Sequence, residues 1–346
     1  MPSMSMPMVS FTLHHVLTSW LWSPFPLVML GVLAGLAYWY LRAGWILATR
    51  GRRWPASRTA SFMVGLLAVE VALQSPVATF TSNQFVSHIV QHLMLMVVAP
   101  VFLALSAPST LFLQTANRKS KIRWLQVLRS RPFAVFTHPI TAWALYFGLM
   151  FWFFLTSLIN TAMLHMPLMD FLNLVFLLGG CLYWWPMVGT DPIIHWKMGY
   201  GARMLNLLLG AAFETFLGIV ILMDSSPIAS MYTLASTHAG GGLLWASTEI
   251  GTVGGFIPII RQWMRSDERA AARADTETES VVAAGGDQPN LGILSGTSAA
   301  SRPATGPAFQ VAGADAQMTT WESAWLARTG SVPSMRPASS AHDGGP

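Results

Sequence analysis

Two histidines lie four positions apart in the segment SHIVQHLMLM, residues 87–96, which is otherwise almost wholly apolar. On an α-helix the rings of His88 and His92 project from one face, about 6 Å apart along the axis. Such a pair can chelate a late first-row metal ion: imidazole suits copper or zinc, and a thioether such as that of Met96, one turn further on, favours Cu(I). The alternative is that both rings hydrogen-bond to neighbouring helices and only hold them together. Because ionisable groups inside a membrane are costly, a pair at this spacing favours the metal site.

The elements that carry these residues are predicted to be membrane-spanning helices. Hydrophobic residues make up 53% of the 346 residues and charged residues 10%, and the mean hydropathy is +0.48, all unlike a soluble domain. About 20 apolar residues cross the ~30 Å of hydrocarbon in a bilayer. Seven such stretches are found, at 25–41, 59–75, 84–105, 139–157, 169–188, 203–222 and 242–260. We therefore expect an all-α membrane protein, a bundle of about seven transmembrane helices.

Lysine and arginine fall on one side of this topology. The segments 42–58 and 106–138 are rich in them, whereas the loops near 76–83, 158–168 and 223–241 contain none. Cytoplasmic loops retain positive charge, so the amino terminus is predicted to lie outside and the carboxyl terminus in the cytoplasm.

The composition changes near residue 265. Residues 1–265 hold 15 basic and 6 acidic residues, and residues 266–346 hold 5 and 9 and are rich in Ala, Gly, Ser, Thr and Pro. We expect a seven-helix transmembrane domain over 1–265 and a disordered cytoplasmic tail over 266–346. The net charge of +5 then reports topology, so the expected partner surface is the lipid bilayer and no nucleic acid.

Further candidate groups gather on the predicted outer side. His165 and His238 are expected to complete a metal site begun by the helical pair. Three carboxylates near the outer ends of helices are expected to orient the ligands or to accept protons: Glu70, Asp170 and Glu249.

Other chemistries are excluded by what the sequence lacks. The single cysteine, Cys181, cannot supply the paired thiolates of a soluble copper chaperone. No P-loop, dinucleotide fingerprint or nucleophile elbow is present, so no catalytic residues are predicted and we do not expect an enzyme.

Several stretches resemble the multi-span CtaG-type cytochrome c oxidase assembly factors, a bacterial family linked to caa-type oxidases. They are YLRAGWILATRGRRWP, FMVGLLAVEVALQSPVATF, HIVQHLMLMVVAPVFLALSAP, YWWPMVGTDP and GGGLLWASTEIG. The resemblance covers nearly all of residues 17–265, and the block H-x-x-Q-H-x-x-L-M is its most specific part. Many relatives have an Asp-Gln pair shortly before the glycine run; this chain reads STHAGGG there, with His238 as the candidate substitute.

The resemblance implies a protein of the bacterial plasma membrane that helps to mature cytochrome c oxidase, with oxidase subunits as partners and copper as the metal delivered. The alternative is a metal or proton transporter or channel, in which Glu70, Glu214, Glu249 and the paired histidines form a pathway. Ionisable groups thin out in the cytoplasmic halves of the third and seventh predicted helices. This distribution favours a site over a conduit.

Overall fold

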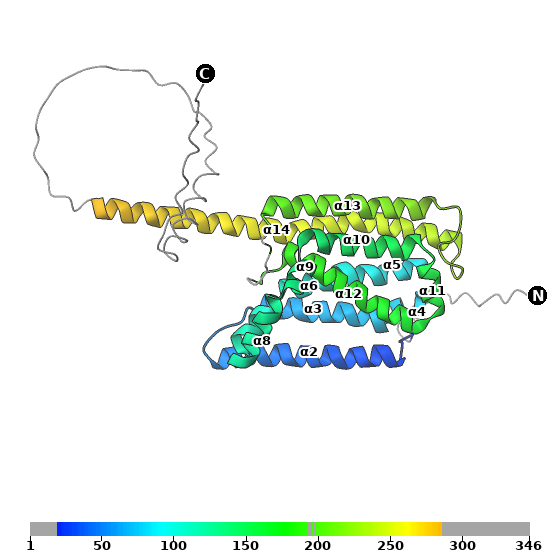
Figure 1. The fold of residues 1–346 in the computed structure, drawn as a ribbon, viewed down its shortest axis with the longest axis horizontal. Helices are drawn as coiled ribbons and strands as arrows, with labels where there is room; N and C mark the ends of the chain where they lie inside the picture. Colours follow the sequence, from blue (N-terminus) through cyan, green and yellow to red (C-terminus); the bar gives the residue numbers. More distant parts are fainter. Residues whose placement is uncertain (1–18, 192–195, 197, 286–346) are drawn as a thin grey trace, which may run out of the picture. The chain divides into compact units, whose positions relative to one another are not determined.

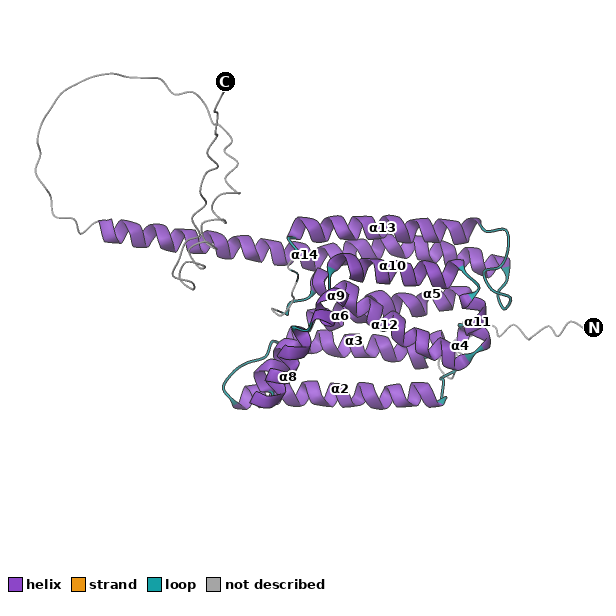
Figure 2. Cartoon of the chain, in the orientation of Figure 1, coloured by secondary structure: helices purple, strands orange, loops and turns teal. Residues whose placement is uncertain are grey.

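A computed structural model describes residues 19–191, 196 and 198–285, and all regular secondary structure in these ranges is helical (Figure 2). Six helical stretches are long and apolar enough to cross a membrane. They are α2 (Pro24–Thr49), α3 with α4 (Ala56–Gln74 and Pro76–Phe80), the stretch Phe85–Thr115, α12 (Met166–Val188), α13 (Tyr200–Met223) and α14 (Leu234–Gly285). A bent pair, α10 (Pro139–Leu155) and α11 (Leu158–Leu164), turns by 75° and makes a seventh span if counted as one. The predicted all-helical, multi-pass architecture is confirmed; the sides on which the termini lie remain a prediction.

The chain divides into two compact units, residues 1–282 and 283–346, and the bundle belongs to the first. Within it α3 and α12 each pack closely on the stretch Phe85–Thr115, α2 packs on α3, and α13 runs beside α14 (Figure 1). Two buried clusters form the core. One centres on Phe85, Phe153 and Phe176, and the other on Tyr40 and Phe62, whose rings stack 4.0 Å apart.

The stretch Phe85–Thr115 is a composite of α5 (Phe85–Leu93), the π-helical turn η1 (Met94–Val98), α6 (Ala99–Leu105) and α7 (Pro108–Thr115). Pro100 has no N–H, so in a regular α-helix the carbonyl of Met96 would lose its partner. The chain widens into a π turn just before the proline, with the Ala99 N–H bonded to the Met94 carbonyl. Gly180 of α12 packs directly on this turn: a Cβ there would lie 2.6 Å from the Met96 carbonyl oxygen.

Two short helices follow, α8 (Arg118–Leu128) and α9 (Arg131–Phe136), in the basic segment between the third and fourth predicted spans. The side chain of Asn117 caps α8, and that of Ser130 caps α9.

The helix α14 continues beyond residue 265, where the sequence predicts the start of a disordered tail. Residues 266–285 are helical, which corrects the first part of that prediction, and residues 267–280 are exposed. The segment ERAAARA within them consists of strong helix formers, so helix propensity overrides the low apolar content. The rest of the predicted tail, 286–346, lies outside the described residues, and the domain boundary at 265 remains a prediction.

A paired-histidine candidate metal site

His88 and His92 turn inward from one face of α5, as their spacing predicts. Both are almost fully buried, with 0% and 3% of their surface exposed, and their Nε2 atoms lie 2.8 Å apart. Gln91, between them, is buried too, and its side-chain amide donates to the Ala72 carbonyl of α3 over 2.8 Å. The glutamine of the H-x-x-Q-H block therefore anchors α5 while the two histidines face the bundle interior.

Aromatic rings surround the pair. The His92 ring meets Phe176 of α12 edge-on at 4.2 Å between centroids and lies 5.1 Å from both Phe153 and Phe154 of α10. His88 stacks on Phe153 at 5.7 Å. These apolar walls leave the ring nitrogens few polar neighbours, so each hydrogen bond that they make matters.

One chain of hydrogen bonds fixes which ring nitrogens carry hydrogen. Tyr232, in the loop before α14, donates its hydroxyl hydrogen to the Thr81 carbonyl over 2.6 Å, because a carbonyl can only accept. Burial raises the pKa of Tyr232, which keeps this hydroxyl protonated. Its oxygen lies 3.1 Å from Nδ1 of His88 and must accept the hydrogen carried there.

The assignment then passes to the second ring. A neutral His88 protonated on Nδ1 has its lone pair on Nε2, so it accepts from Nε2–H of His92. The lone pair of His92 is thereby left on Nδ1. This atom is buried and has no hydrogen-bond partner among the described residues. The pair thus holds one free, buried imidazole lone pair.

The other predicted ligands are not brought to this pair. His165 is exposed between α11 and α12, and the Nε2 atom of His238 lies 2.8 Å from the Asp224 carbonyl in the α13–α14 connection. Hydrogen bonds from Ser226, with a smaller contribution from the charge of His238, lower the pKa of the Asp224 carboxyl. Met96 is buried, but it belongs to the π turn and so departs from the α-helical register of the two histidines.

The predicted carboxylates are also dispersed. Glu249 is exposed on α14, next to Thr248, which is 2% exposed and faces the interior. Asp170 is half-buried near the start of α12, and Glu70 is half-buried on α3, where its Oε2 atom has no hydrogen-bond partner in the described part of the chain. Within the described ranges, no three His, Cys, Asp or Glu side chains come together as a metal site. Of the predicted set, only His88 and His92 meet.

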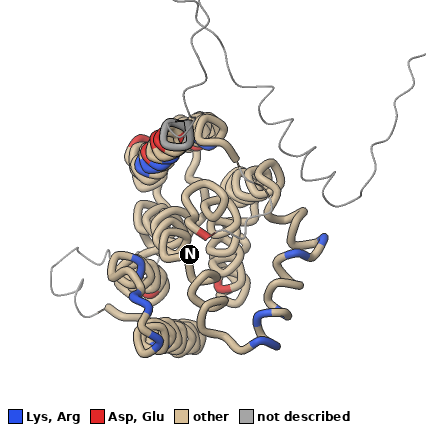
Figure 3. The backbone as a smooth tube through the Cα atoms, turned by 90° about the vertical axis from the view of Figure 1, so that its left-hand side faces the viewer, with Lys and Arg blue, Asp and Glu red and all other residues tan. Residues whose placement is uncertain are grey.

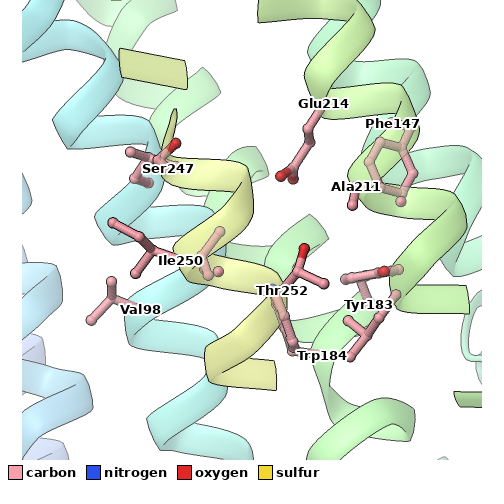
Figure 4. A pocket seen from close by; sticks show the side chains of 14 residues that line it. Val98, Phe147, Tyr183, Trp184, Ala211, Glu214, Ser247, Ile250 and Thr252 are labelled. Atoms are coloured by element: carbon pink, nitrogen blue, oxygen red, sulfur yellow. The ribbon is translucent and has the colours of Figure 1, made fainter. Parts of the chain in front are cut away.

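A second polar group inside the bundle is the half-buried Glu214 of α13. Its carboxyl group points into a cavity of about 200 Å³ that α13 and α14 share with α12 and η1 (Figure 4). The Tyr146 hydroxyl donates to Oε1 of Glu214 over 3.2 Å. The other lining groups are mostly apolar and include Leu93, the residue after His92. The carboxyl group therefore has a hydrogen-bond donor and a largely apolar surrounding.

The chain was compared with known proteins. A sequence profile of the family described as cytochrome c oxidase caa3 assembly factor (Caa3_CtaG) matches residues 38–266, about two thirds of the chain. The chain belongs to this family. The match runs from within α2 into α14 and includes both histidines of the pair.

Curated relatives of this chain include uncharacterized proteins of Mycobacterium bovis and Mycobacterium tuberculosis. Each is 28% identical over 293 residues, which is 79% of this chain and 43% of the relative. An uncharacterized protein of Mycobacterium leprae is 28% identical over 262 residues, 70% of this chain and 39% of the relative. The chain thus spans about two fifths of the length of these relatives. No solved structure matches it significantly.

Tyr232 was not predicted from the sequence as a partner of the histidine pair. The contact joins a loop to a helix 144 positions away in the sequence, and local residue spacing cannot predict such a contact. The lining of the pair by Phe153, Phe154 and Phe176 was likewise not foreseen, although the run FWFFL marks α10 as unusually aromatic.

Proposed function

We propose that this assembly factor binds copper at His88 and His92 and passes it to cytochrome c oxidase. The observation that carries the proposal is the 2.8 Å approach of two buried Nε2 atoms on a helix that matches the family profile. Oxidase subunits as partners, and the bacterial plasma membrane as location, are parts of the same proposal.

The distance between the two nitrogens sets what binding requires. With metal–nitrogen bonds of ~2.0 Å, nitrogens 2.8 Å apart subtend about 90° at the ion. A tetrahedral site with bonds of ~2.0 Å needs them about 3.3 Å apart. An ion therefore replaces the hydrogen bond between the rings, and a tetrahedral angle at the ion requires the two nitrogens to move apart by about 0.5 Å.

The hydrogen that the two rings share can move to another nitrogen of the pair when an ion binds. If the ion takes the lone pairs of both Nε2 atoms, the hydrogen on His92 Nε2 must leave. The free lone pair on His92 Nδ1 can hold it, so His92 stays neutral by exchanging one tautomer for the other. Capture then requires no net loss of a proton from the buried pair.

Two ligands leave an ion with open coordination positions. Transfer of the ion requires an open coordination position, because a ligand of the receiving protein must bind the ion before the two histidines release it. A site completed by three or four protein ligands would suit storage or a structural role better.

The proposal is tested in cells that lack this protein and are complemented with wild type, His88→Ala, His92→Ala or both, at matched membrane levels. Each single change is expected to cost nearly as much oxidase activity as the double change, because one imidazole is a poor chelate and ligands of one ion are non-additive. Added copper should restore the single variants by mass action without changing their abundance.

The matched control is His165→Ala, which removes an exposed histidine away from the pair and should leave activity unchanged. Full oxidase activity of the double variant at limiting copper would rule out the proposed role. Additive losses that follow protein abundance would instead assign the two rings to packing.

A further inference from the structure

A cavity of about 490 Å³ lies where α12 ends and α13 begins, and basic side chains line it from three helices. They are Arg58 of α3, Arg203 of α13, and Arg265 and Arg269 of α14; we call this set the arginine pocket. Figure 3 looks onto this end of the bundle, where lysine and arginine gather on several elements. We propose that the arginine pocket binds the phosphate of an anionic phospholipid headgroup.

The charge of the pocket favours an anion. Four guanidinium groups face one carboxylate, that of Asp191, so the formal balance is +3. Asp191 is already engaged: its Oδ1 atom accepts the Thr110 N–H over 2.8 Å and also the Thr110 hydroxyl, and Arg58 is the arginine whose charge acts on it. Arg203, Arg265 and Arg269 remain to be neutralised.

Arg203 is held ready to receive a ligand. Its Nε atom donates to the Met198 carbonyl over 3.1 Å, and its Nη1 atom donates to the Met187 carbonyl and to Gln262 Oε1 over 3.3 and 3.2 Å. The guanidinium group also lies 5.4 Å from the centroid of the Tyr200 ring. All three acceptors are uncharged, and among the described residues no acceptor is found for the two N–H groups of Nη2. A guanidinium fixed in this way matches the paired oxygens of a phosphate.

The position of the pocket favours a lipid as the source of that phosphate. α12 ends at Val188, α13 begins at Tyr200 and α3 begins at Ala56, so the pocket lies at the level where spanning helices leave the hydrocarbon. Trp196 and Tyr200 line it, and Trp and Tyr are enriched at headgroup depth. Basic pockets between transmembrane helices on the cytoplasmic side are suited to anionic headgroups. This inference does not depend on copper binding.

The test titrates the purified full chain, in a detergent free of anionic lipid, with short-chain phosphatidylglycerol, phosphatidylcholine or inorganic phosphate. The Arg265→Gln, Arg269→Gln double variant is compared with Arg261→Gln, Arg273→Gln, which removes the same charge from exposed positions of α14 outside the pocket. Thermal unfolding without lipid verifies that both variants are folded.

Phosphatidylglycerol is expected to bind wild type and the control alike, and to bind the pocket variant at least about tenfold more weakly, since charge-assisted hydrogen bonds to the phosphate are lost. Phosphatidylcholine and inorganic phosphate should bind wild type weakly. If both variants bind phosphatidylglycerol equally weakly, the arginine pocket is not the binding site, because the affinity would then depend only on the total positive charge of α14. If inorganic phosphate binds as tightly as phosphatidylglycerol, the site is one for free phosphate, and the proposal of a lipid ligand is refuted.

Discussion

Replacing Tyr232 with phenylalanine tests the hydrogen-bond chain that fixes the histidine tautomers. The change removes the hydroxyl group whose oxygen accepts the hydrogen of His88 Nδ1 and whose O–H donates to the Thr81 carbonyl. His88 is fully buried, so its Nδ1–H loses its only acceptor in the described chain, which costs about 1–3 kcal/mol. Reversing both tautomers gives no relief, because the hydrogen would then lie on His92 Nδ1, which has no hydrogen-bond partner within the described ranges. The half-buried Thr81 carbonyl adds little, since water can reach it. We expect a loss of about 2 kcal/mol in the free energy of unfolding.

Two measurements on the Tyr232→Phe variant test the assignment of the His88 and His92 tautomers. Reversible unfolding in detergent gives the loss of stability, and ring ¹⁵N chemical shifts of histidine-labelled chain report whether His88 carries hydrogen on Nδ1. The control is Tyr38→Phe, whose side chain is 65% exposed on α2. If the variant is as stable as wild type and the shifts of both rings are unchanged, the tautomer assignment is refuted.

Two further predictions concern the packing around the site. Gly180→Val should destabilise the protein by about 1–3 kcal/mol, because its Cβ would meet the Met96 carbonyl at 2.6 Å, whereas Gly148→Ala, with no atom within 4 Å, should be neutral or stabilising; thermal unfolding compares them. Glu214→Leu should cost about 1–3 kcal/mol, since it leaves the Tyr146 hydroxyl without its acceptor. Glu214→Gln keeps an acceptor and should remain close to wild type; equal stability of Leu and Gln variants in the same unfolding assay would contradict the role of this hydrogen bond.

The spans and the inward face of α5 could be predicted from the sequence because hydrophobic length and helical period are local properties. Seven apolar stretches translate into helices once the solvent is a bilayer. The i, i+4 spacing of His88 and His92 fixes a common face whatever the rest of the chain does. The prediction of a disordered tail was wrong for residues 266–285, where α14 continues as a helix, because the low apolar content was given more weight than local helix propensity.

The other side chains that contact the histidine pair could not be predicted from the sequence, because these contacts depend on how distant segments of the chain pack together. His165 and His238 are predicted on the same side of the membrane as the pair. Residues on one side can still lie far apart in the membrane plane, so a common side does not predict a contact. Tyr232 reaches His88 through the way α14 packs against α5, where Gly240 approaches the Phe85 ring. Met96 was expected in register, and the π turn before Pro100 alters that register.

X-ray absorption of the copper-loaded full chain tests the central claim most directly. The account predicts two imidazole nitrogens on each copper ion at ~2.0 Å, and loss of the bound copper in both His88→Ala and His92→Ala while His165→Ala retains it. Copper without imidazole ligands, or copper held unchanged after removal of His88 or His92, would contradict the account.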